Sequence, residues 1–507
     1  MTGIELYDTL TGKVRPLATR ESGKVALYAC GPTVYDHPHL GHARSALTYD
    51  VLRRYLEWRG LEVRHVANIT DIDDNIINRA RDEGRTESEV AVEWERVYID
   101  AMARLDVLDP HDRPRATEWV TEMVDFVGRI IDAGAAYTTP TGVYLRVGGV
   151  DGYGDLVHRD LDDLRASAGA RVEVDEDKED PLDFALWKAA KPDEPSWPSP
   201  WGPGRPGWHI ECVAMSLGIL GDDFDIHGGG NDLVFPHHTN ERAEALAVGR
   251  SFARHWVHNA MLNIEGTKMS KSLGNYRTVV EMLDEHPLNG RAFRLLVLQT
   301  HYRKTMEVNP ELMASARTAV QRLDALARRF HGADDDSGEF KQPEDRATEP
   351  AEPFGADGAE PDEPTASESR PSPVDQVLER IDAKGAKRMA DRLERLFRSA
   401  MDLDMSTPLA LSRIFAALHR ANATLDEGSV GGVVLARKVI ELADVLGLQA
   451  GTASQASRDP AIEELVARRQ EAREAKDWAT ADALRDELAA TGVIVEDTPA
   501  GPIWHRK

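Results

Sequence analysis

The stretch Tyr28–Ser45, YACGPTVYDHPHLGHARS, places a thiol and two imidazoles close together. Cys30 ends a short apolar run that a Gly-Pro pair stops, which predicts a buried strand entering a turn. His39 and His42 flank Gly41 at the start of a helical pattern. Backbone N–H groups and the helix dipole favour phosphate at such a position, and the imidazoles can donate hydrogen bonds to it. A surface or capping role for the two histidines is the alternative.

A second thiol, Cys212, could join Cys30 in a metal site. His237 and Glu241 follow a helix-starting proline four residues apart, so they share one helix face. Two thiolates, an imidazole and a carboxylate form an acceptable tetrahedral zinc set. An ordinary helix pair is the alternative, because no CxxC motif supports the site. His238 is expected to point elsewhere, in a structural or substrate-contacting role.

Two lysines in the segment GTKMSKSLGN could clamp phosphate. Lys268 and Lys271 enclose Met269 and Ser270, and their charge suits the place where negative charge gathers on a leaving pyrophosphate. A Lys-x-x-Lys pair on a solvent face is the alternative. The combination of this segment with the earlier histidine pair is more specific than either alone.

The elements that must position these residues indicate an α/β protein with a parallel sheet. The strand pattern in Leu61–Asn75 ends in Asp71, Asp73 and Asp74, which predicts strand ends that face a ligand; a solvated loop or a helix cap is the alternative. Gly228–Gly230 follows another short strand and predicts backbone that is open to a ligand. Further expected elements are helices at 87–105, 116–133 and 309–329, strands within 137–163, a charged loop in 171–187, a stiff loop without regular structure at 191–208, a helix beginning after 407–408, a helix pair at 460–488 and a hairpin at 493–504.

Composition narrows the possible functions of the 507 residues. The formal net charge is -26, and lysine supplies only 14 of the 61 basic residues, so general affinity for nucleic acid through bulk charge is not expected. A polyanion would have to be read by local basic patches. An acidic, lysine-poor surface also favours a halophilic protein, which a KCl titration of folding and activity would test.

Neither a membrane-spanning run nor a signal-peptide core is expected from the sequence, which predicts a cytoplasmic protein with no membrane partner. In that compartment Cys30 and Cys212 are expected to remain reduced thiols.

Taken together, the motifs resemble those of the cysteinyl-tRNA synthetases, a family of class I aminoacyl-tRNA synthetases. The resemblance covers nearly the whole chain apart from one insertion. It is carried by YACGPTVYDHPHLGHARS, NITDIDDNII, VDEDKEDPLDFALWK, GWHIECVAM, DIHGGGNDLVFPHH, GTKMSKSLGN, AREAKDWATADALRDEL and the final PIWHRK. One local departure is Thr239, where the family usually has glutamate between the two histidines and the asparagine.

The resemblance implies roles for particular residues. Zinc would be held by Cys30, Cys212, His237 and Glu241. ATP would be bound by His39, Gly41, His42, Lys268, Met269, Ser270 and Lys271, of which His39, His42, Lys268 and Lys271 would be catalytic. The substrate cysteine would contact Gly31, Thr70, Trp208 and Asp232, and anticodon bases would contact Arg473, Trp478, Asp482 and Asp497. For the last group a helix face with a buried tryptophan is the alternative.

The implied architecture is a Rossmann-type parallel-sheet catalytic domain with a connective insertion, an α-helical bundle and a small C-terminal anticodon-binding domain. The expected boundaries are 1–330 for the catalytic domain, with the insertion at about 135–205 and the KMSKS region at about 260–310, then an acidic disordered insertion at 331–373, the bundle at 374–450 and the C-terminal region at 451–507. The implied activity is ATP-dependent ligation of L-cysteine to tRNA(Cys) through a cysteinyl-adenylate, with one Zn²⁺ per chain, Mg²⁺ with ATP, and a monomeric enzyme.

Two alternatives remain at this point. A related ligase could join cysteine to an amino sugar, although such relatives lack an RNA-reading C-terminal part. A tRNA-binding or regulatory protein with an inactive catalytic domain would lack an intact set of nucleotide and metal residues.

Overall fold

The computed structural model describes residues 3–168, 177–268, 276–335, 383–427, 430–450, 460–474, 477–490, 493–498 and 501–506. These residues form two compact units. The first comprises Met1–Val320, Leu396–Arg413 and Asp444–Leu448, and the second comprises Gln321–Arg395, Ile414–Ala443 and Gln449–Lys507.

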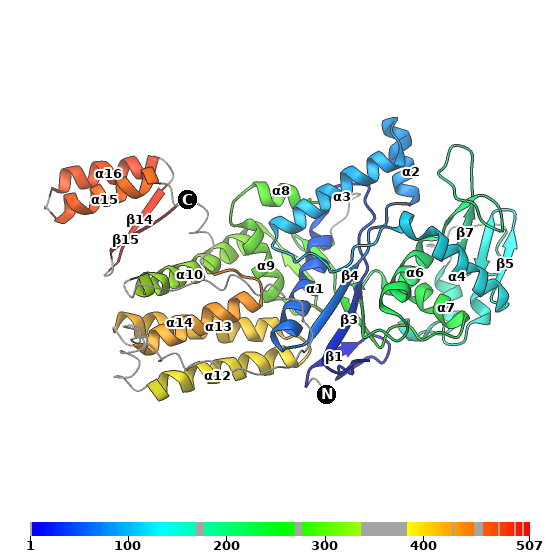
Figure 1. Ribbon diagram of the computed structural model, residues 1–507, viewed down its shortest axis with the longest axis horizontal. Coiled ribbons are helices and arrows are strands. Elements are labelled where there is room, and N and C mark those ends of the chain that lie inside the picture. Colours follow the sequence, from blue (N-terminus) through cyan, green and yellow to red (C-terminus); the bar gives the residue numbers. More distant parts are fainter. Residues whose placement is uncertain are drawn as a thin grey trace, which may run out of the picture. The chain divides into compact units, whose positions relative to one another are not determined.

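A four-stranded parallel sheet organises the first unit, with strand order β10-β9-β3-β4. Its strands are β3 (Lys24–Ala29), β4 (Glu62–Ala67), β9 (Ile226–Gly230) and β10 (His255–Asn259). Helix α1 (Leu40–Trp58) connects β3 to β4 and lies beside them (Figure 1). Its residues Leu47, Leu52 and Leu56 are fully buried, as the helical spacing of apolar residues requires. The predicted Rossmann-type fold class is confirmed.

A second, antiparallel sheet lies between the two halves of the parallel sheet in the sequence, as predicted. Its order is β5-β6-β7-β8, with β5 (Ala136–Thr139), β6 (Gly142–Leu145), β7 (Phe184–Ala189) and β8 (Gly204–Pro206). The helices of this part of the chain are α2 (Asp74–Glu83), α3 (Glu87–Arg104), α4 (Val120–Asp132), α5 (Leu161–Ala168), α6 (Trp208–Leu220) and α7 (Thr239–Ala247). Short 3-10 turns lie at Ala116–Trp119, Val147–Gly149 and Asp155–Val157.

The remaining strands of the first unit form two small sheets. Strands β1 (Glu5–Asp8) and β2 (Lys13–Pro16) pair with each other. Strand β11 (Leu262–Ile264) lies between β12 (Thr267–Lys268), which is antiparallel to it, and β13 (Met306–Val308), which is parallel. Helices α8 (Val279–Asp284) and α9 (Asn289–Gln299) lie between β12 and β13 in sequence.

The C-terminal third is helical until its last hairpin. Its helices are α10 (Pro310–Asp335), α12 (Ala383–Asp402), α13 (Thr407–Asp426), α14 (Val430–Val445), α15 (Pro460–Glu474) and α16 (Trp478–Ala490). The predicted hairpin is confirmed as antiparallel strands β14 (Val493–Thr498) and β15 (Gly501–Arg506). A small core of Ile462, Val466, Leu488 and Val493 joins this hairpin to α15 and α16.

Some sequence expectations lie beyond the described residues. Residues 171–176 of the predicted charged segment and residues 336–373, most of the predicted acidic insertion, are among these. Helix α10 continues to Asp335, past its predicted end at Arg329. The predicted domain boundaries stay predictions.

Two expectations about loops differ from the structure. The segment 191–208 contains the three-residue strand β8, because an edge strand can include prolines where no ladder donor is needed. The carboxylates after β4 bind the protein itself. Asp73 caps α2 by accepting from the Asn75 N–H, as the capping alternative predicts. Asp71 accepts from Thr117, and Asp74 pairs with Lys188 and Arg205.

No helix within the described ranges is long and apolar enough to cross a membrane.

Candidate active site and metal centre

Three segments that are distant in sequence meet at the carboxyl ends of β3 and β9. Cys30 directly follows β3, and its N–H donates to the Gly228 carbonyl on β9 at 3.0 Å. Helix α6 contributes Cys212. The turn Val234–His238 and helix α7 contribute His237 and Glu241. Parallel strands end at one edge of the sheet, which is where ligands bind in such folds.

Cys30, Cys212, His237 and Glu241 have ligand atoms within 4.8 Å of one another. The two Sγ atoms are 3.7 Å apart, the Cys30 Sγ lies 3.5 Å from Glu241 Oε1, and His237 Nε2 lies 2.9 Å from the same oxygen. Tetrahedral zinc with its usual bond lengths separates its ligand atoms by roughly 3.3–3.8 Å. Both cysteines are free thiols. This donor set therefore fits a zinc ion.

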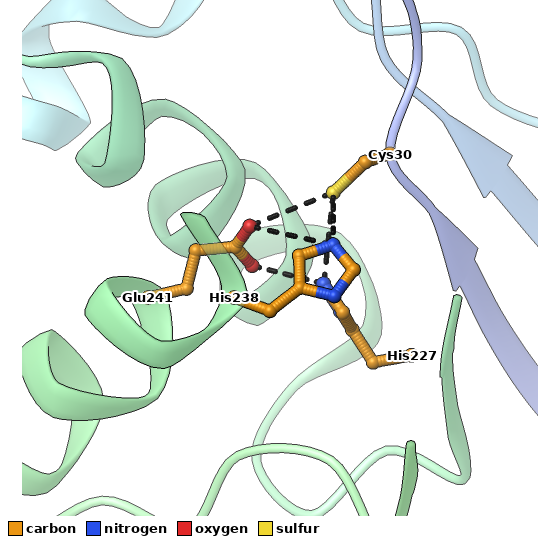
Figure 2. A group of neighbouring side chains, drawn as sticks. All are labelled: Cys30, His227, His238 and Glu241. Atoms are coloured by element: carbon orange, nitrogen blue, oxygen red, sulfur yellow. Dashed lines mark hydrogen bonds and ion pairs between the residues drawn. The ribbon is translucent and has the colours of Figure 1, made fainter. Parts of the chain in front are cut away.

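A second group shares Cys30 and Glu241 and adds His227 and His238 (Figure 2). His238 Nε2 lies 3.2 Å from the Cys30 sulfur, and His227 Nε2 lies 2.9 Å from Glu241 Oε2. The expectation that His238 points elsewhere is therefore wrong. A non-helical residue, Phe235, precedes it, and the turn from Val234 to His238 winds more widely than an α-helix, so both histidines reach the cluster.

Other histidines hold the inner ones in place. The Nδ1 atoms of His209 and His237 are 2.9 Å apart, which leaves Nε2 of His237 toward Glu241. His238 Nδ1 lies 2.8 Å from His258 Nε2, and His258 Nδ1 lies 2.7 Å from the Thr9 hydroxyl. Such outer hydrogen bonds fix the ring orientation of metal-binding histidines.

The electrostatics of the cluster favour a cation. Burial opposes ionisation of Glu241, but His227, His237 and His238 hold its pKa well below the usual range. The hydrogen bond with Cys30 lowers the pKa of Cys212 to about 6. In contrast, burial and the hydrogen bond with Cys212 raise the pKa of Cys30. Burial disfavours a charged His237, yet Glu241 and Cys212 raise its pKa to about 10. A thiolate and a carboxylate together suit a divalent ion.

The Gly228–Gly230 segment is filled by the protein rather than left open. A Cβ on Gly228 would lie 2.2 Å from the Tyr49 ring, and one on Gly229 would lie 2.7 Å from the His238 ring. One on Gly230 would lie 2.4 Å from an Asp232 oxygen. These glycines let side chains of the protein approach β9, so the expectation of open backbone for a ligand is wrong.

His39 and His42 form a reciprocal cap at the start of α1. His39 Nδ1 accepts the His42 N–H at 3.3 Å, and His42 Nδ1 accepts the His39 N–H at 3.2 Å. The rings stack with centroids 3.7 Å apart. Since both Nδ1 atoms are acceptors, each neutral ring carries its proton on Nε2. The capping alternative is correct, and it also orients two Nε2–H donors at a helix N-terminus that includes Gly41.

The second nucleotide segment is described only at its start. Lys268 belongs to β12, where it pairs with Asn263 of β11. Met269, Ser270 and Lys271 lie outside the described residues.

The four residues predicted to meet the substrate amino acid differ in their surroundings. Trp208 begins α6, is 37% exposed, and its ring lies 4.1 Å from that of His237. A Cβ on Gly31 would overlap the Asn68 carbonyl at 1.6 Å, so only glycine fits there. Thr70 is buried and donates its hydroxyl hydrogen to Glu211 at 3.0 Å. Asp232 is exposed.

The predicted anticodon residues lie in the second unit. Trp478 is the first residue of α16 and is 59% exposed, so the alternative of a buried tryptophan does not apply. Asp482 is exposed on the same helix, with Oδ1 3.2 Å from Arg485. Arg473 is in the last turn of α15, and Asp497 belongs to β14.

Sequence reasoning missed several residues of the cluster. His227, His209 and His258 were not singled out, and neither was Glu244, whose two carboxylate oxygens are buried and have no hydrogen-bond partner among the residues that the structure describes. The available signal was polarity inside apolar elements, since His227 and His258 interrupt strands whose other residues are mostly buried.

Comparisons with known proteins agree with this geometry. Residues 16–318 match the family model for the tRNA synthetases class I (C) catalytic domain, and residues 457–504 match the cysteinyl-tRNA ligase anticodon binding domain. The cysteine--tRNA ligase of Brevibacillus brevis is 42% identical, and the alignment covers 100% of both chains. That of Symbiobacterium thermophilum is 43% identical over 99% of this chain and 100% of its own.

Solved structures support the fold. Mycobacterium tuberculosis methionyl-tRNA synthetase in complex with methionyl-adenylate has a TM-score of 0.55 at 15% identity, covering 84% of this chain and 90% of its own. Together, the parallel sheet, the group of potential metal ligands at its edge and these full-length relatives show that the chain belongs to the cysteine--tRNA ligase family of class I tRNA synthetases.

Proposed function

We propose that this enzyme ligates L-cysteine to tRNA(Cys) in two steps, through a cysteinyl-adenylate. The observation that carries the proposal is the approach of Cys30, Cys212, His237 and Glu241 to within 4.8 Å of one another at the sheet edge. Relatives of the same length named cysteine--tRNA ligase support the overall reaction.

The group containing Cys212 is the better candidate for selecting the substrate. His237 adjoins Trp208, which is 37% exposed, whereas the side chains of His227 and His238 are entirely buried. A zinc ion held there would supply a soft Lewis acid that prefers a thiolate sulfur to the hydroxyl of serine. Each tenfold preference requires about 1.4 kcal/mol, which a pocket relying on shape alone could not provide repeatedly for near-isosteres.

In the first step, the cysteine carboxylate attacks the α-phosphorus of ATP. The bond from that phosphorus to the bridging oxygen breaks, and pyrophosphate leaves with the electron pair. The Nε2–H groups of His39 and His42 are proposed to donate to phosphate oxygens, with Gly41 and the helix N-terminus beside them. The negative charge on pyrophosphate would be offset by Lys268 and Lys271 and by Mg²⁺ bound to ATP. Met269 and Ser270, which lie between the two lysines in sequence, would also bind ATP.

The substrate amino acid would lie against Trp208 and Gly31, with the Asp232 carboxylate as the partner for its ammonium group. Thr70 uses its hydroxyl hydrogen for Glu211, so it would act as an acceptor or through its backbone. Positioning of both substrates carries the catalysis, and no protein nucleophile is needed.

In the second step, a hydroxyl of the terminal ribose of tRNA attacks the carbonyl carbon of the adenylate. The bond from that carbon to the phosphate oxygen breaks, AMP leaves with the electron pair, and the hydroxyl proton is released. The exposed Trp478 would stack on an anticodon base, and Arg473, Asp482 and Asp497 would contact base edges. The match of residues 457–504 to an anticodon binding domain disfavours the amino-sugar ligase.

One assay tests the proposal against both alternatives. Purified protein should catalyse cysteine-dependent exchange between pyrophosphate and ATP and should then charge tRNA(Cys). Exchange without charging would favour the small-molecule ligase, and no exchange would leave only the binding protein. Metal analysis should find one zinc per chain.

The surroundings in which the enzyme works are also part of the proposal. A monomer in the cytoplasm, adapted to high salt, is consistent with the charge of -26. Activity that peaks at low KCl would contradict the salt adaptation.

A further inference from the structure

Arg44 is a buried cation with an unusual set of partners. It lies in α1, two residues after His42, and is 1% exposed. Its guanidinium donates to the backbone carbonyls of Met261, Tyr302 and Lys304, the Tyr302 contact being 3.3 Å. Within the described part of the chain, Arg44 forms no ion pair with a carboxylate. Burial lowers the pKa of Arg44 to about 10.

The three carbonyls lie at the base of the sheet that leads to Lys268. Met261 directly precedes β11, the hairpin partner of β12, and Lys304 lies just before β13. The two segments are also joined by backbone hydrogen bonds, from Ala260 to Tyr302 at 2.8 Å and from Met306 to Met261 at 3.2 Å. One side chain of α1 thus holds the segments that lead into β11 and β13.

The segment 302–304 is fixed from another direction by Asp404. The Tyr302 hydroxyl donates to Asp404 at 2.5 Å, and Arg303 Nε donates to it at 2.7 Å. Asp404 also accepts the Tyr7 N–H at 2.8 Å. Because Asp404 holds this segment independently, the contacts of Arg44 add a connection to α1 in particular.

Stability alone does not explain an arginine at this position. A buried charge carries a desolvation cost that neutral carbonyls offset only in part, and an apolar side chain of similar volume is often no worse. The guanidinium fork does provide several donors in one rigid plane, which sets the distance between the elements it joins.

We propose that Arg44 is a positioning residue that fixes the separation of the His39–His42 cap from the β11–β12 hairpin, and thereby sets the affinity for the triphosphate of ATP. The inference rests on the proposed function, since it assigns the two elements to one nucleotide. Arg44 itself does not touch the substrate.

The test compares Arg44→Met and Arg44→Lys with Arg53→Lys. Arg53 lies on the same helix, but its guanidinium donates to Glu57 and to the Asp109 carbonyl. In pyrophosphate exchange, the KM for ATP should rise about tenfold in Arg44→Met, the effect expected for losing a strong charge-assisted hydrogen bond. Arg44→Lys should recover part of this loss, and Arg53→Lys should match the wild type.

The KM for cysteine and the zinc content should stay within about twofold in all three variants, because the proposed effect acts on ATP alone. An equal change in both KM values, or none in either, would overturn the proposal.

Hydrogen–deuterium exchange separates positioning from general loss of fold without using activity. In Arg44→Met, amide exchange should become faster in residues 260–268 and 302–308 and stay unchanged in 226–230 of β9. Faster exchange throughout the first unit would overturn the proposal. If the wild type shows no pyrophosphate exchange, the proposed function fails, whereas the amide-exchange result still shows whether Arg44 holds the hairpin.

Discussion

Two buried polar groups in the first unit have opposite designs. The thiol–histidine cluster consists of Cys30, Cys212, His227, His237, His238 and Glu241. The arginine–aspartate network consists of Asp50, Arg54, Asp106 and Arg294. Both include residues with side chains hidden from solvent, yet one gathers ligand atoms around a point and the other pairs opposite charges.

The network connects elements of the first unit through complete pairing of its central carboxylate. Arg294 Nη1 lies 2.5 Å from Asp50, and Arg54 and the Leu108 N–H supply further donors to that carboxylate at 2.9 and 2.8 Å. Arg294 also donates to the Asp106 carbonyl at 2.6 Å. These bonds join α1 to α9 and to the turn after α3.

The cluster places a carboxylate beside two thiols and several histidines. These groups can share protons with one another. Among the described residues, both Glu244 oxygens and His227 Nδ1 lack hydrogen-bond partners beside the cluster, and so does Arg294 Nε in the network. Unpaired buried groups cost stability. The contrast teaches that the network pairs its central carboxylate with cations of the protein itself, whereas the cluster gathers two thiols and a carboxylate whose repulsion, once they are ionised, a bound cation would offset.

The sharpest test of the contrast is Cys212→Ser. It should abolish zinc retention and reduce cysteine-dependent pyrophosphate exchange by more than about a thousandfold, since a metal centre contributes several kcal/mol. The melting temperature of the zinc-free protein should change little. Full activity in this variant would remove the metal mechanism.

Breaking the arginine–aspartate network should lower stability and leave zinc binding unchanged. Arg294→Met should lower the free energy of unfolding by about 3 kcal/mol, because Asp50 would lose a buried partner. Zinc content measured by atomic absorption should be unchanged. The double variant Asp50→Leu/Arg294→Met should recover much of the loss in urea unfolding, as removal of both charges leaves none unpaired. A double variant weaker than the single one would show that the pair itself is strongly stabilising.

His209→Phe tests whether the outer histidines serve the cluster. The Nδ1 of His237 would lose its partner at 2.9 Å, and zinc affinity should fall about 10- to 100-fold in chelator competition. The matched variant His65→Phe alters another buried histidine outside the cluster and should leave zinc affinity unchanged. Equal affinities in wild type and His209→Phe would contradict the orienting role.

The network also predicts a pH dependence. Burial would raise the pKa of Asp50, but Arg294, Arg54 and the Leu108 N–H outweigh it and lower the pKa below its ordinary value of 3.8. The stabilisation is therefore present above about pH 4 and is lost as the pH falls toward the folded-state pKa. Melting temperatures of wild type and Asp50→Asn should converge below that pH. A constant difference down to the acid limit of folding would refute this assignment.

The smallest effect is expected at a feature that belongs to neither group. Thr86 and Glu89 form a reciprocal capping box at the start of α3. Thr86→Ala should lower the free energy of unfolding by about 1 kcal/mol without any change in zinc content or ATP affinity. A larger effect on activity than on stability would indicate that α3 takes part in the site.

The sequence predicted local features well. The apolar spacing in α1 predicted a helix, and the alternation in β4 predicted a strand. The four-residue separation of His237 from Glu241 predicted that these two side chains share one helix face, and they are in contact in the structure. It failed where one segment fills space left by another. Tyr49 and His238 occupy the room beside Gly228 and Gly229, and no local pattern reports which side chain will do so.

The sequence by itself determined the types of chemistry available: thiols, a capping histidine pair and a lysine segment, in motifs specific enough to indicate a family. Only the tertiary structure decided that Cys30 and Cys212 meet, that His227 and His238 join them, and that Arg44 ties α1 to the β11–β12 hairpin. The physical reason is the distance along the chain over which each kind of interaction acts. Periodicity and capping act within a few residues, whereas contacts between residues 30, 212 and 241 depend on how whole elements pack.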